Sequence, residues 1–453
     1  MTSLAQTLDA LVDPGSVRQI PVPLRSFGGD YGASLERARA RSGVDEAVQV
    51  MYADVAGWPV VVIGGEFGFL AGSVGQSAAD RVVAGYQAAT RDRLPVITLP
   101  TSGGTRMQEG ATAFFRMTDI AWAAEEHERT GCVRIGWLRN PTTGGVMATW
   151  GSYAYITAAE PGALLGFLGP RVYEVLHGEP FPPVQPAENL ARVGVIDDVV
   201  ELADLRGWVS RILSVTNGKD EPVEVGPGHE PVRVDAWEAV TRTRAADRPG
   251  PLQVLDLLTE RTDLHGTGSG ETGTGIQVSL GRIRGWRVAV VAQTRQEVTP
   301  ADLRMAQRGI RLAARLGLPV VTLVDTPGGE LSGQAEESAM AGEIARTMAL
   351  LHSVQVPSVC CIMGQGCGGA ALALIPAKMV ICMENGWVSP LPPEGASAIM
   401  HRTPDRAADM ARQQRVGALD LLDAEVIDVV VGEGPDLVGA VADAVARGLE
   451  ERK

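Results

Sequence analysis

The sequence predicts an α/β protein built from two tandem copies of one unit. Residues 320–324 and 359–363 are short apolar runs of the kind found in buried strands. Between these runs, apolar residues recur at helical spacing, at Ala341, Ile344, Met348 and Leu351. Strands that alternate with helices in this way are typical of a buried parallel sheet with crossover helices. Residues 318–371 therefore indicate the fold class, and the rest of the chain is organised around them.

The evidence for two copies is a repeat at one constant spacing. The stretches LPVITLPTSGG and LPVVTLVDTPGG begin at residues 94 and 318, which lie 224 positions apart. The same separation joins the Gly-Gly pairs at residues 144 and 368 and the Glu-x-Gly motifs at residues 160 and 384. Landmarks nearer the ends of the copies are separated by 228 and 231 positions, which indicates small insertions. We therefore predict a tandem duplication of one α/β unit.

The elements and domain limits follow from composition. In the first copy we expect a leading helix and a Pro-rich segment over residues 1–30, helices over 34–50 and 80–91, and strands over 60–63 and 94–99. In the second copy, a polar Gly-rich loop between residues 265 and 277 precedes a strand over 277–283. A chain of 453 residues is too long for one ordinary core. Because residues 215–232 are polar and rich in Pro and Gly, we predict domains over 1–220 and 235–453 with a linker over 221–234.

Composition argues against several classes of function. The formal net charge of −14 disfavours a nucleic-acid partner and an anionic membrane surface. The N-terminus has no basic segment followed by an apolar core, and no long apolar run occurs, so we expect a cytoplasmic protein without a membrane partner. The five cysteines form no CxxC pair and lie mostly in apolar segments. We expect them to be reduced and buried, with neither zinc nor a disulfide framework.

The two Gly-Gly turns, Gly144-Gly145 and Gly368-Gly369, are the strongest candidates for chemistry. In a strand-turn-helix context, a glycine pair leaves main-chain N–H groups unshielded, and the positive end of the following helix adds to their field. Such a turn can hold a developing oxyanion, for example a thioester enolate. The alternative interpretation is that the glycines only allow tight packing of helix against strand. The duplication at constant spacing, taken together with the family resemblance described below, favours the oxyanion interpretation.

The sequence SGGTRMQEG at residues 102–110 is a second candidate. Gly103, Gly104 and Thr105 are suited to shaping an acyl pocket, with Arg106 tying the loop to a carboxylate such as Glu109. The alternative interpretation is an ordinary strand-to-helix connection. Spacing alone leaves both interpretations open.

Other motifs point away from common chemistries. Residues 268–273 match GxGxxG, but a strand follows where a dinucleotide site needs a helix, so we predict a flexible loop. Neither a GxxxxGK[ST] loop nor a GxSxG elbow occurs. The six histidines lack ligand spacing, and the acidic pairs at 125–126, 197–198 and 336–337 are typical of solvated helix faces or turns. Lys378-Met379 lacks the Ala-Met-Lys-Met hairpin of biotin carriers, so any biotin must arrive on another chain.

Longer motifs resemble the carboxyltransferase component of biotin-dependent acyl-CoA carboxylases, within the crotonase-like superfamily. The first half resembles the bacterial beta subunit in FGFLAGSVG (67–75), SGGTRMQEG (102–110), PTTGGV (141–146) and PGALLGFLGPRV (161–172). The second half resembles the alpha subunit in RP (248–249), LGLPVVTLVDTPGG (316–329), GQGCGGAAL (364–372) and PEGA (393–396). The resemblance covers about residues 30–432.

The resemblance implies a crotonase-like (ClpP/crotonase) β/α spiral in each half, with acyl-CoA bound mainly by the first and carboxybiotin by the second. The active site would form between two protomers of a dimer or larger homo-oligomer. It implies that the N–H groups of Gly144 and Gly145 hold the thioester enolate, and that those of Gly368 and Gly369 polarise the biotin ureido carbonyl. The biotin anion would take the α-proton, so no protein base is needed. The substrate-binding residues implied are Gly72, Ser73, Gly103, Gly104, Thr105, Arg106, Gly328, Gly329 and Ala370.

The implied partners are a biotin carboxylase and a separate biotin carrier protein, and the implied site contains no metal. The sequence departs from the family in AGSVGQ (71–76) and DTPGGE (325–330), and it lacks the four-cysteine zinc ribbon of the beta subunit. We expect transfer of carboxyl to a short acyl-CoA, with acetyl-CoA giving malonyl-CoA for fatty acid or polyketide precursors. The alternatives are a decarboxylase of a malonyl thioester, with or without biotin, and a non-catalytic scaffold.

Overall fold

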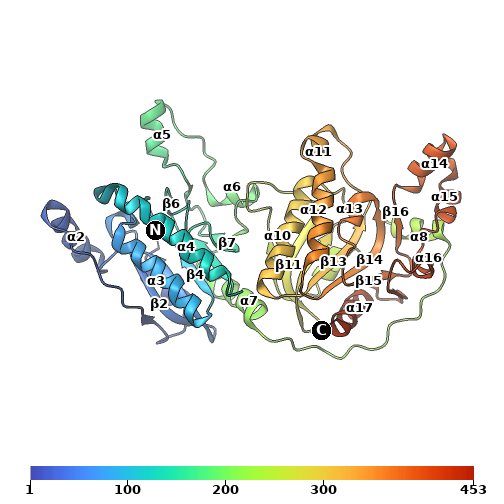
Figure 1. The fold of residues 1–453 in the computed structure, drawn as a ribbon, viewed down its shortest axis with the longest axis horizontal. Coiled ribbons are helices and arrows are strands. Elements are labelled where there is room, and N and C mark those ends of the chain that lie inside the picture. Colours follow the sequence, from blue (N-terminus) through green and yellow to red (C-terminus); the bar gives the residue numbers. More distant parts are fainter. Residues whose placement is uncertain (1, 453) are drawn as a thin grey trace. The chain divides into compact units, whose positions relative to one another are not determined.

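The computed structural model describes residues 2–452, which divide between residues 217 and 218 into two compact units (Figure 1). The segment predicted as a linker is hydrogen-bonded along the second unit. The N–H groups of Glu221 and Val223 donate to the carbonyls of Gly285 and Arg284, at 3.1 and 3.0 Å. None of the helices in the described range is long and apolar enough to cross a membrane.

A seven-stranded sheet forms the centre of the first unit, in the order β1-β2-β3-β4-β5-β7-β9. Its strands are β1 (Arg18–Gln19), β2 (Val48–Val55), β3 (Trp58–Gly65), β4 (Val96–Leu99), β5 (Arg134–Leu138), β7 (Ile156–Ala159) and β9 (Asp198–Val199). Strands β3 to β9 run parallel, but β1, β2 and β3 pair antiparallel. The predicted parallel sheet is thus present from β3 to β9, and an antiparallel hairpin is added at its edge, where Ala56 and Gly57 both adopt positive φ and close a tight turn.

The helices of the first unit cover this sheet. They are α1 (Leu4–Leu11), α2 (Gly29–Ser42), α3 (Gln76–Asp92), α4 (Gly110–Glu128), α5 (Pro170–His177), α6 (Ala187–Arg192) and α7 (Leu205–Asn217), with short 3₁₀ turns η1 (Leu70–Gly72) and η2 (Met107–Glu109). Helices α3 and α4 lie side by side over the sheet (Figure 1). Val82 and Tyr86 of α3 and Ile120 of α4 are buried against Val50 and Ile63 of the strands. This apolar layer holds the strand ends, and the loops that follow them, in place.

The second unit repeats the arrangement around an eight-stranded sheet, in the order β10-β11-β12-β13-β14-β15-β17, with β16 paired to β14. Its strands are β10 (Thr259–Leu264), β11 (Ile276–Ile283), β12 (Trp286–Gln293), β13 (Val320–Thr326), β14 (Ser358–Cys367), β15 (Met379–Met383), β16 (Trp387–Ser389) and β17 (Val429–Val431). Its helices are α8 (Ala236–Thr243), α9 (Pro251–Leu255), α10 (Pro300–Leu316), α11 (Gly333–Glu337), α12 (Met340–Ser353), α13 (Gly368–Leu372), α14 (Pro393–His401), α15 (Ala407–Gln413), α16 (Ala418–Asp423) and α17 (Leu437–Glu451), with η3 (Pro404–Arg406). Helix α17 packs on β14 and β15 through Val441 and Val445.

The two units match element by element, at the separations seen in the sequence. Helices α3 and α10 each contain 17 residues and begin 224 positions apart. Strands β4 and β13 also begin 224 positions apart, and so do β5 and β14. The hairpins β2-β3 and β11-β12 are separated by 228 positions. The same chain path is therefore built twice, and corresponding loops follow corresponding strands.

Two of the predicted helices differ from the observed ones. The helix expected over residues 34–50 is α2, which ends at Ser42 because Gly43 adopts a left-handed cap. Residues 48–50 instead open β2, where the β-branched Val48 and Val50 are buried in the sheet. Helix α12 exists as predicted, but of the predicted apolar stripe only Leu351 is fully buried, and Met340, Glu343 and Thr347 complete the buried face. The two polar residues on this face are satisfied by the amide of Gln307, at 2.7 and 3.1 Å.

Candidate functional site

The loop that follows β4 in the first unit and the loop that follows β13 in the second unit have the same geometry. We call these loops, at residues 102–104 and 326–328, the first and second corner. In the first unit, the hydroxyl of Ser102 accepts the N–H of Gly104 at 2.9 Å. In the second, the hydroxyl of Thr326 accepts the N–H of Gly328 at 3.2 Å. Gly104 and Gly328 have φ values of +116° and +136°, which glycine adopts without strain. Each corner therefore exposes backbone in a conformation that the sequence repeats 224 positions later.

A Gly-Gly turn lies beside each corner. Gly144 and Gly368 have nearly equal φ values of +64° and +68°. Gly145 and Gly369 leave no room for a side chain, because an added Cβ would lie 2.8 Å from Thr105 Oγ1 and 2.9 Å from Ile344 Cδ1, respectively. Tight packing, the alternative interpretation of these glycines, is thus part of their role.

The main-chain N–H groups of residues 145–147 form a row of three donors in the first unit. None of them donates to an acceptor among residues 2–452. The N–H of Gly144, by contrast, is already shared between the carbonyls of Gly166 and Phe167, at 3.1 Å each. The expectation that Gly144 presents its N–H to a ligand is therefore wrong in this conformation. The free donors begin one residue later, at Gly145.

The second unit presents the equivalent donors at the start of α13. The first N–H groups of a helix have no partner within it, so those of Gly368, Gly369 and Ala370 have no acceptor inside α13. The carbonyl of Ala370 accepts the amide of Gln293 at 2.9 Å, which fixes this turn to β12. The helix dipole expected to support both corners is small here, because α13 has five residues and no helix follows Gly145. The donors must act as individual N–H groups.

Most of the residues predicted to bind substrate gather around these corners. In the first unit, the N–H of Gly103 donates to Ala71 at 2.9 Å, and the N–H of Val74 donates to Gly104 at 3.0 Å. Gly72 is confined by Thr101, whose carbonyl would lie 2.4 Å from an added Cβ. The predicted residues brought together here are Gly72, Ser73, Gly103, Gly104, Thr105, Gly144 and Gly145, and in the second unit Gly328, Gly329, Gly368, Gly369 and Ala370.

Arg106 stabilises the loops rather than contacting a ligand. Its side chain is fully buried, and the guanidinium donates to Glu46 at 2.5 Å and to the carbonyl of Ser73 at 2.7 Å. A third contact, at 3.4 Å, reaches Glu109, as the sequence suggested. The prediction that Arg106 binds substrate is therefore wrong for its side chain, because no donor of the guanidinium reaches a surface. The partner that sequence reasoning missed is Glu46, which lies 60 positions away.

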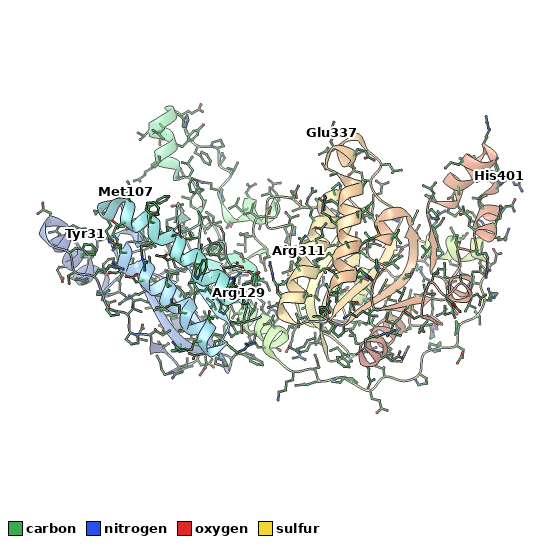
Figure 2. All side chains as sticks on the ribbon, in the orientation of Figure 1. Tyr31, Met107, Arg129, Arg311, Glu337 and His401 are labelled. Atoms are coloured by element: carbon green, nitrogen blue, oxygen red, sulfur yellow. The ribbon has the colours of Figure 1, made fainter. Side chains whose placement is uncertain are left out.

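Tyr31 completes this buried cluster from α2 (Figure 2). Its hydroxyl donates to Glu109, and burial together with this hydrogen bond raises the pKa of Tyr31 to about 12. Glu109 also accepts the N–H of Gln76 at 2.7 Å, at the start of α3. Burial alone would lower the pKa of Arg106, but the hydrogen bonds and charge of Glu46 raise it above its usual value. The loop that carries Ser102–Gly104 is thus held by the buried ion pair of Arg106 and Glu46.

A buried carboxylate lies below the second corner. Asp325 is the penultimate residue of β13, is fully buried, and accepts the N–H of Gln365 at 3.0 Å through Oδ1. Its other oxygen has no hydrogen-bond partner, and the nearest cation is Arg295 at 3.4 Å. Burial raises the pKa of Asp325 to about 6, although Gln365 and the charges of Arg295 and Arg248 oppose the shift. Sequence reasoning passed over Asp325 because it lies within an apolar strand.

The remaining polar candidates do not form a site. His127 is buried and bonded to the carbonyl of Leu94 at 2.8 Å, and burial lowers its pKa to about 4. Asp197, expected in a solvated pair, is instead buried and accepts the N–H of Thr157 at 2.9 Å. No group of three or more metal-ligating side chains occurs within residues 2–452. Residues 268–273 form a loop before β11, as predicted, and all five cysteines are free, four of them buried.

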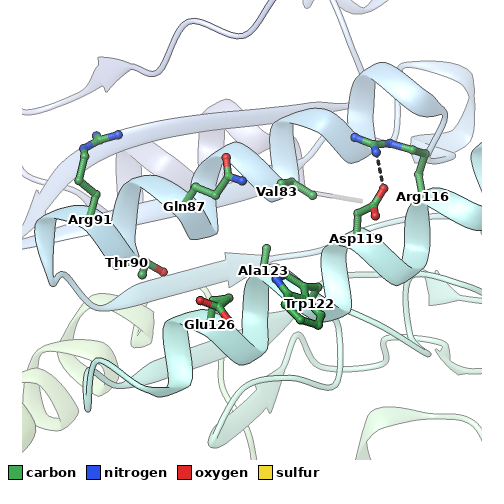
Figure 3. A pocket seen from close by; sticks show the side chains of 9 residues that line it. All are labelled: Val83, Gln87, Thr90, Arg91, Arg116, Asp119, Trp122, Ala123 and Glu126. Atoms are coloured by element: carbon green, nitrogen blue, oxygen red, sulfur yellow. Dashed lines mark hydrogen bonds and ion pairs between the residues drawn. The ribbon is translucent and has the colours of Figure 1, made fainter.

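A groove of about 590 Å³ lies between α3 and α4 (Figure 3). Val83 and Gln87 of α3 line one side, and Arg116 and Trp122 of α4 line the other. Arg116 is paired with Asp119 (Figure 3). The groove contains none of the predicted site residues.

Comparison with known proteins matches residues 5–449 to the model of the carboxyl transferase domain. The chain belongs to the carboxyl transferase family. This carboxyl transferase is 44% identical over 445 residues to the probable biotin-dependent acyl-coenzyme A carboxylase beta3 subunit of Mycobacterium tuberculosis, covering 95% of this chain and 89% of the relative. It is 34% identical over 490 residues to the acetyl-coenzyme A carboxylase carboxyl transferase subunits beta/alpha of Parafrankia sp., covering 97% of this chain and 80% of the relative. The predicted family is thus confirmed.

Solved structures confirm the predicted crotonase-like fold of this carboxyl transferase. The transcarboxylase 12S core, solved with methylmalonyl-coenzyme A and methylmalonic acid bound, aligns with a TM-score of 0.81 at 18% identity, over 99% of this chain and 89% of that one. A single-chain, multi-domain long-chain acyl-CoA carboxylase aligns with a TM-score of 0.77 at 20% identity, over 99% of this chain and 46% of that one. At these identities the likeness concerns the fold alone.

Proposed function

We propose that this carboxyl transferase moves a carboxyl group from carboxybiotin, held on a separate carrier protein, to the α-carbon of a short acyl-CoA. The observation that carries the proposal is the row of free N–H donors at residues 145–147. We propose acetyl-CoA as the acceptor, with malonyl-CoA as the product. The Parafrankia relative, named as an acetyl-coenzyme A carboxylase subunit, supports this choice.

The donors at residues 145–147 suit the stabilisation of an enolate. When the α-proton leaves, negative charge builds on the thioester oxygen, and preorganised N–H groups lower the energy of that state. Gly145 and Val146 take the role first expected of Gly144 and Gly145. Loss of one donor of this kind commonly slows a reaction by roughly 10²–10³-fold.

Within the described part of the chain, the buried carboxylates at the first corner are not free to act as the base. The two buried carboxylates there, Glu46 and Glu109, are both engaged by Arg106. Carboxybiotin supplies both the carboxyl group and, once that group has left, a basic nitrogen to accept the α-proton. The residues of this chain therefore need only orient the thioester and hold its charge.

The second unit supplies the site for the biotin ureido group in this proposal. The first-turn N–H groups of Gly368, Gly369 and Ala370 are neutral donors that fit a carbonyl oxygen. Hydrogen bonds to that oxygen favour charge on it and so favour release of the carboxyl group. Small residues at these positions also let a ring system approach the backbone closely.

The partners we propose are a biotin carboxylase, a biotin carrier protein and further copies of this chain. The transcarboxylase 12S core is described as a hexamer, which supports self-association. Helix α4 exposes Phe114, Phe115 and Trp122, with 63%, 69% and 71% of their surface accessible. Aromatic side chains exposed together on one helix are typical of an interface.

The test is the reverse reaction of the purified chain. With malonyl-CoA as substrate, we expect acetyl-CoA to be released only when biocytin is added. The reaction is monitored by chromatography of the CoA esters. Loss of CO2 at the same rate without biocytin would instead identify a decarboxylase. The Gly145→Ala variant should lose activity, whereas Gly207→Ala, on an exposed turn of α7, should match the wild type.

A further inference from the structure

One aromatic residue, Phe167, lies beside the donor row and plays no part in the core. Its carbonyl accepts the N–H of Gly144 at 3.1 Å, so its backbone lies next to residues 145–147. Its side chain is 73% exposed. A large, exposed apolar side chain is therefore attached to backbone that adjoins the turn where, under the proposed function, a thioester would bind.

The backbone of Phe167 is held firmly although its side chain is exposed. Strand β8 (Leu165–Gly166) pairs with β6 (Thr142–Thr143), which leads directly into the Gly-Gly turn. On the other side, the amide of Gln185 donates to the carbonyl of Leu168 at 2.7 Å. A side chain at position 166 would displace Gln185, because an added Cβ would lie 2.4 Å from Gln185 Nε2. The ring of Phe167 is thus attached to a fixed point beside the donors.

The second unit lacks this feature. The pairing of Thr143 with Gly166 corresponds to the pairing of Cys367 with Ser389, which places Pro390 at the position of Phe167. Proline is smaller and has no aromatic ring. The aromatic residue therefore occurs only beside the corner assigned to acyl-CoA.

We propose that Phe167 is a specificity-determining residue of the acyl-CoA site, where its ring forms one wall of the acyl pocket and limits the size of the acyl group. The inference rests on the proposed function, because it requires that the thioester bind at residues 145–147. A hydrophobic wall discriminates between acyl groups that differ by one or more methylenes, typically by 10–200-fold per methylene. A short acyl group contacts the ring, whereas a longer or branched one collides with it.

The experiment compares malonyl-CoA with ethylmalonyl-CoA in the biocytin-dependent reverse reaction. We expect Phe167→Ala to raise the ratio of kcat/KM for ethylmalonyl-CoA over malonyl-CoA by about 10-fold or more. Phe167→Leu should give an intermediate ratio. Phe167→Tyr keeps the ring and should therefore have the same ratio as the wild type. Val175→Ala is the matched control, since this residue is 84% exposed on α5.

An unchanged ratio in Phe167→Ala and Phe167→Leu, with an active wild type, would overturn the role of Phe167 and leave the proposed function standing. If the wild type converts neither CoA ester, with or without biocytin, both proposals fall. A change of ratio in Val175→Ala equal to that in Phe167→Ala would also overturn the assignment, because the effect would then belong to the whole segment.

Discussion

The sharpest prediction concerns Gly145 and the hydroxyl that faces it. An alanine Cβ at this position would lie 2.8 Å from Thr105 Oγ1, whereas ordinary contacts begin at 3.4 Å. Either the turn or the Thr105 hydroxyl must therefore move by about 0.6 Å, and a turn that moves this far lengthens a typical 2.9 Å hydrogen bond to about 3.5 Å and in effect breaks it. We expect Gly145→Ala to lower kcat for malonyl-CoA by roughly 10²–10³-fold, the usual effect of losing one oxyanion donor.

The second half of this prediction is a rescue. Thr105→Ala removes the hydroxyl that collides with the new methyl group, so the double variant should recover most of the lost activity. The assay is a double-mutant cycle on kcat, with thermal unfolding of all four proteins as the control for folding. Additive losses in the double variant would show that the collision is not the cause. Full activity of Gly145→Ala alone would refute the donor role of this turn.

Three further predictions concern the stability and assembly of the molecule. Arg106→Ala leaves Glu46 buried without its partner, so it should lower the free energy of unfolding by about 3–5 kcal/mol in urea titration. The control is Arg25→Ala, at a more exposed ion pair, which should change this free energy by less than about 1 kcal/mol. The pKa of Asp325 is about 6 in the folded protein, above its usual 3.8. Between these pH values the folded protein keeps a proton that the unfolded chain has lost, so the free energy of unfolding should fall as pH rises from about 4 to 6. Asp325→Asn should then be more stable than the wild type at pH 8, by up to roughly 3 kcal/mol, and this difference in stability should shrink below pH 4. A difference that stays constant at all pH values would contradict the role of the Asp325 proton. Trp122→Ser should weaken self-association in sedimentation velocity, because this indole is 71% exposed on α4, and an unchanged sedimentation coefficient would argue against an interface there.

Much of the fold could be predicted because duplication leaves a trace that does not depend on propensity. The separation of 224 positions paired the stretches that form β4 and β13, and with them the two Gly-Gly turns. Local propensity was less reliable. It extended α2 through residues 43–50, since the amphipathic pattern continued past the capping Gly43 into a buried strand.

The site was only partly predictable, for two physical reasons. The partner of Arg106 is Glu46, and nothing in the local sequence of either residue indicates an ion pair that forms across the fold. The N–H of Gly144 is used by carbonyls of Gly166 and Phe167, a contact that depends on the two-residue strands β6 and β8. Strands so short carry no periodicity, so the first free donor could be identified only from the structure.

The way the connecting segment is held has a consequence for how such a chain can be divided. Residues 221 and 223 bond to the β11–β12 hairpin, and both sheets are completed by strands of their own unit. A break after residue 217 would therefore leave no strand without its neighbours and would keep the connector on the second fragment. The two units would then fold in the same way whether they are encoded by one gene or by two. The connecting segment would chiefly ensure that they are made in equal number.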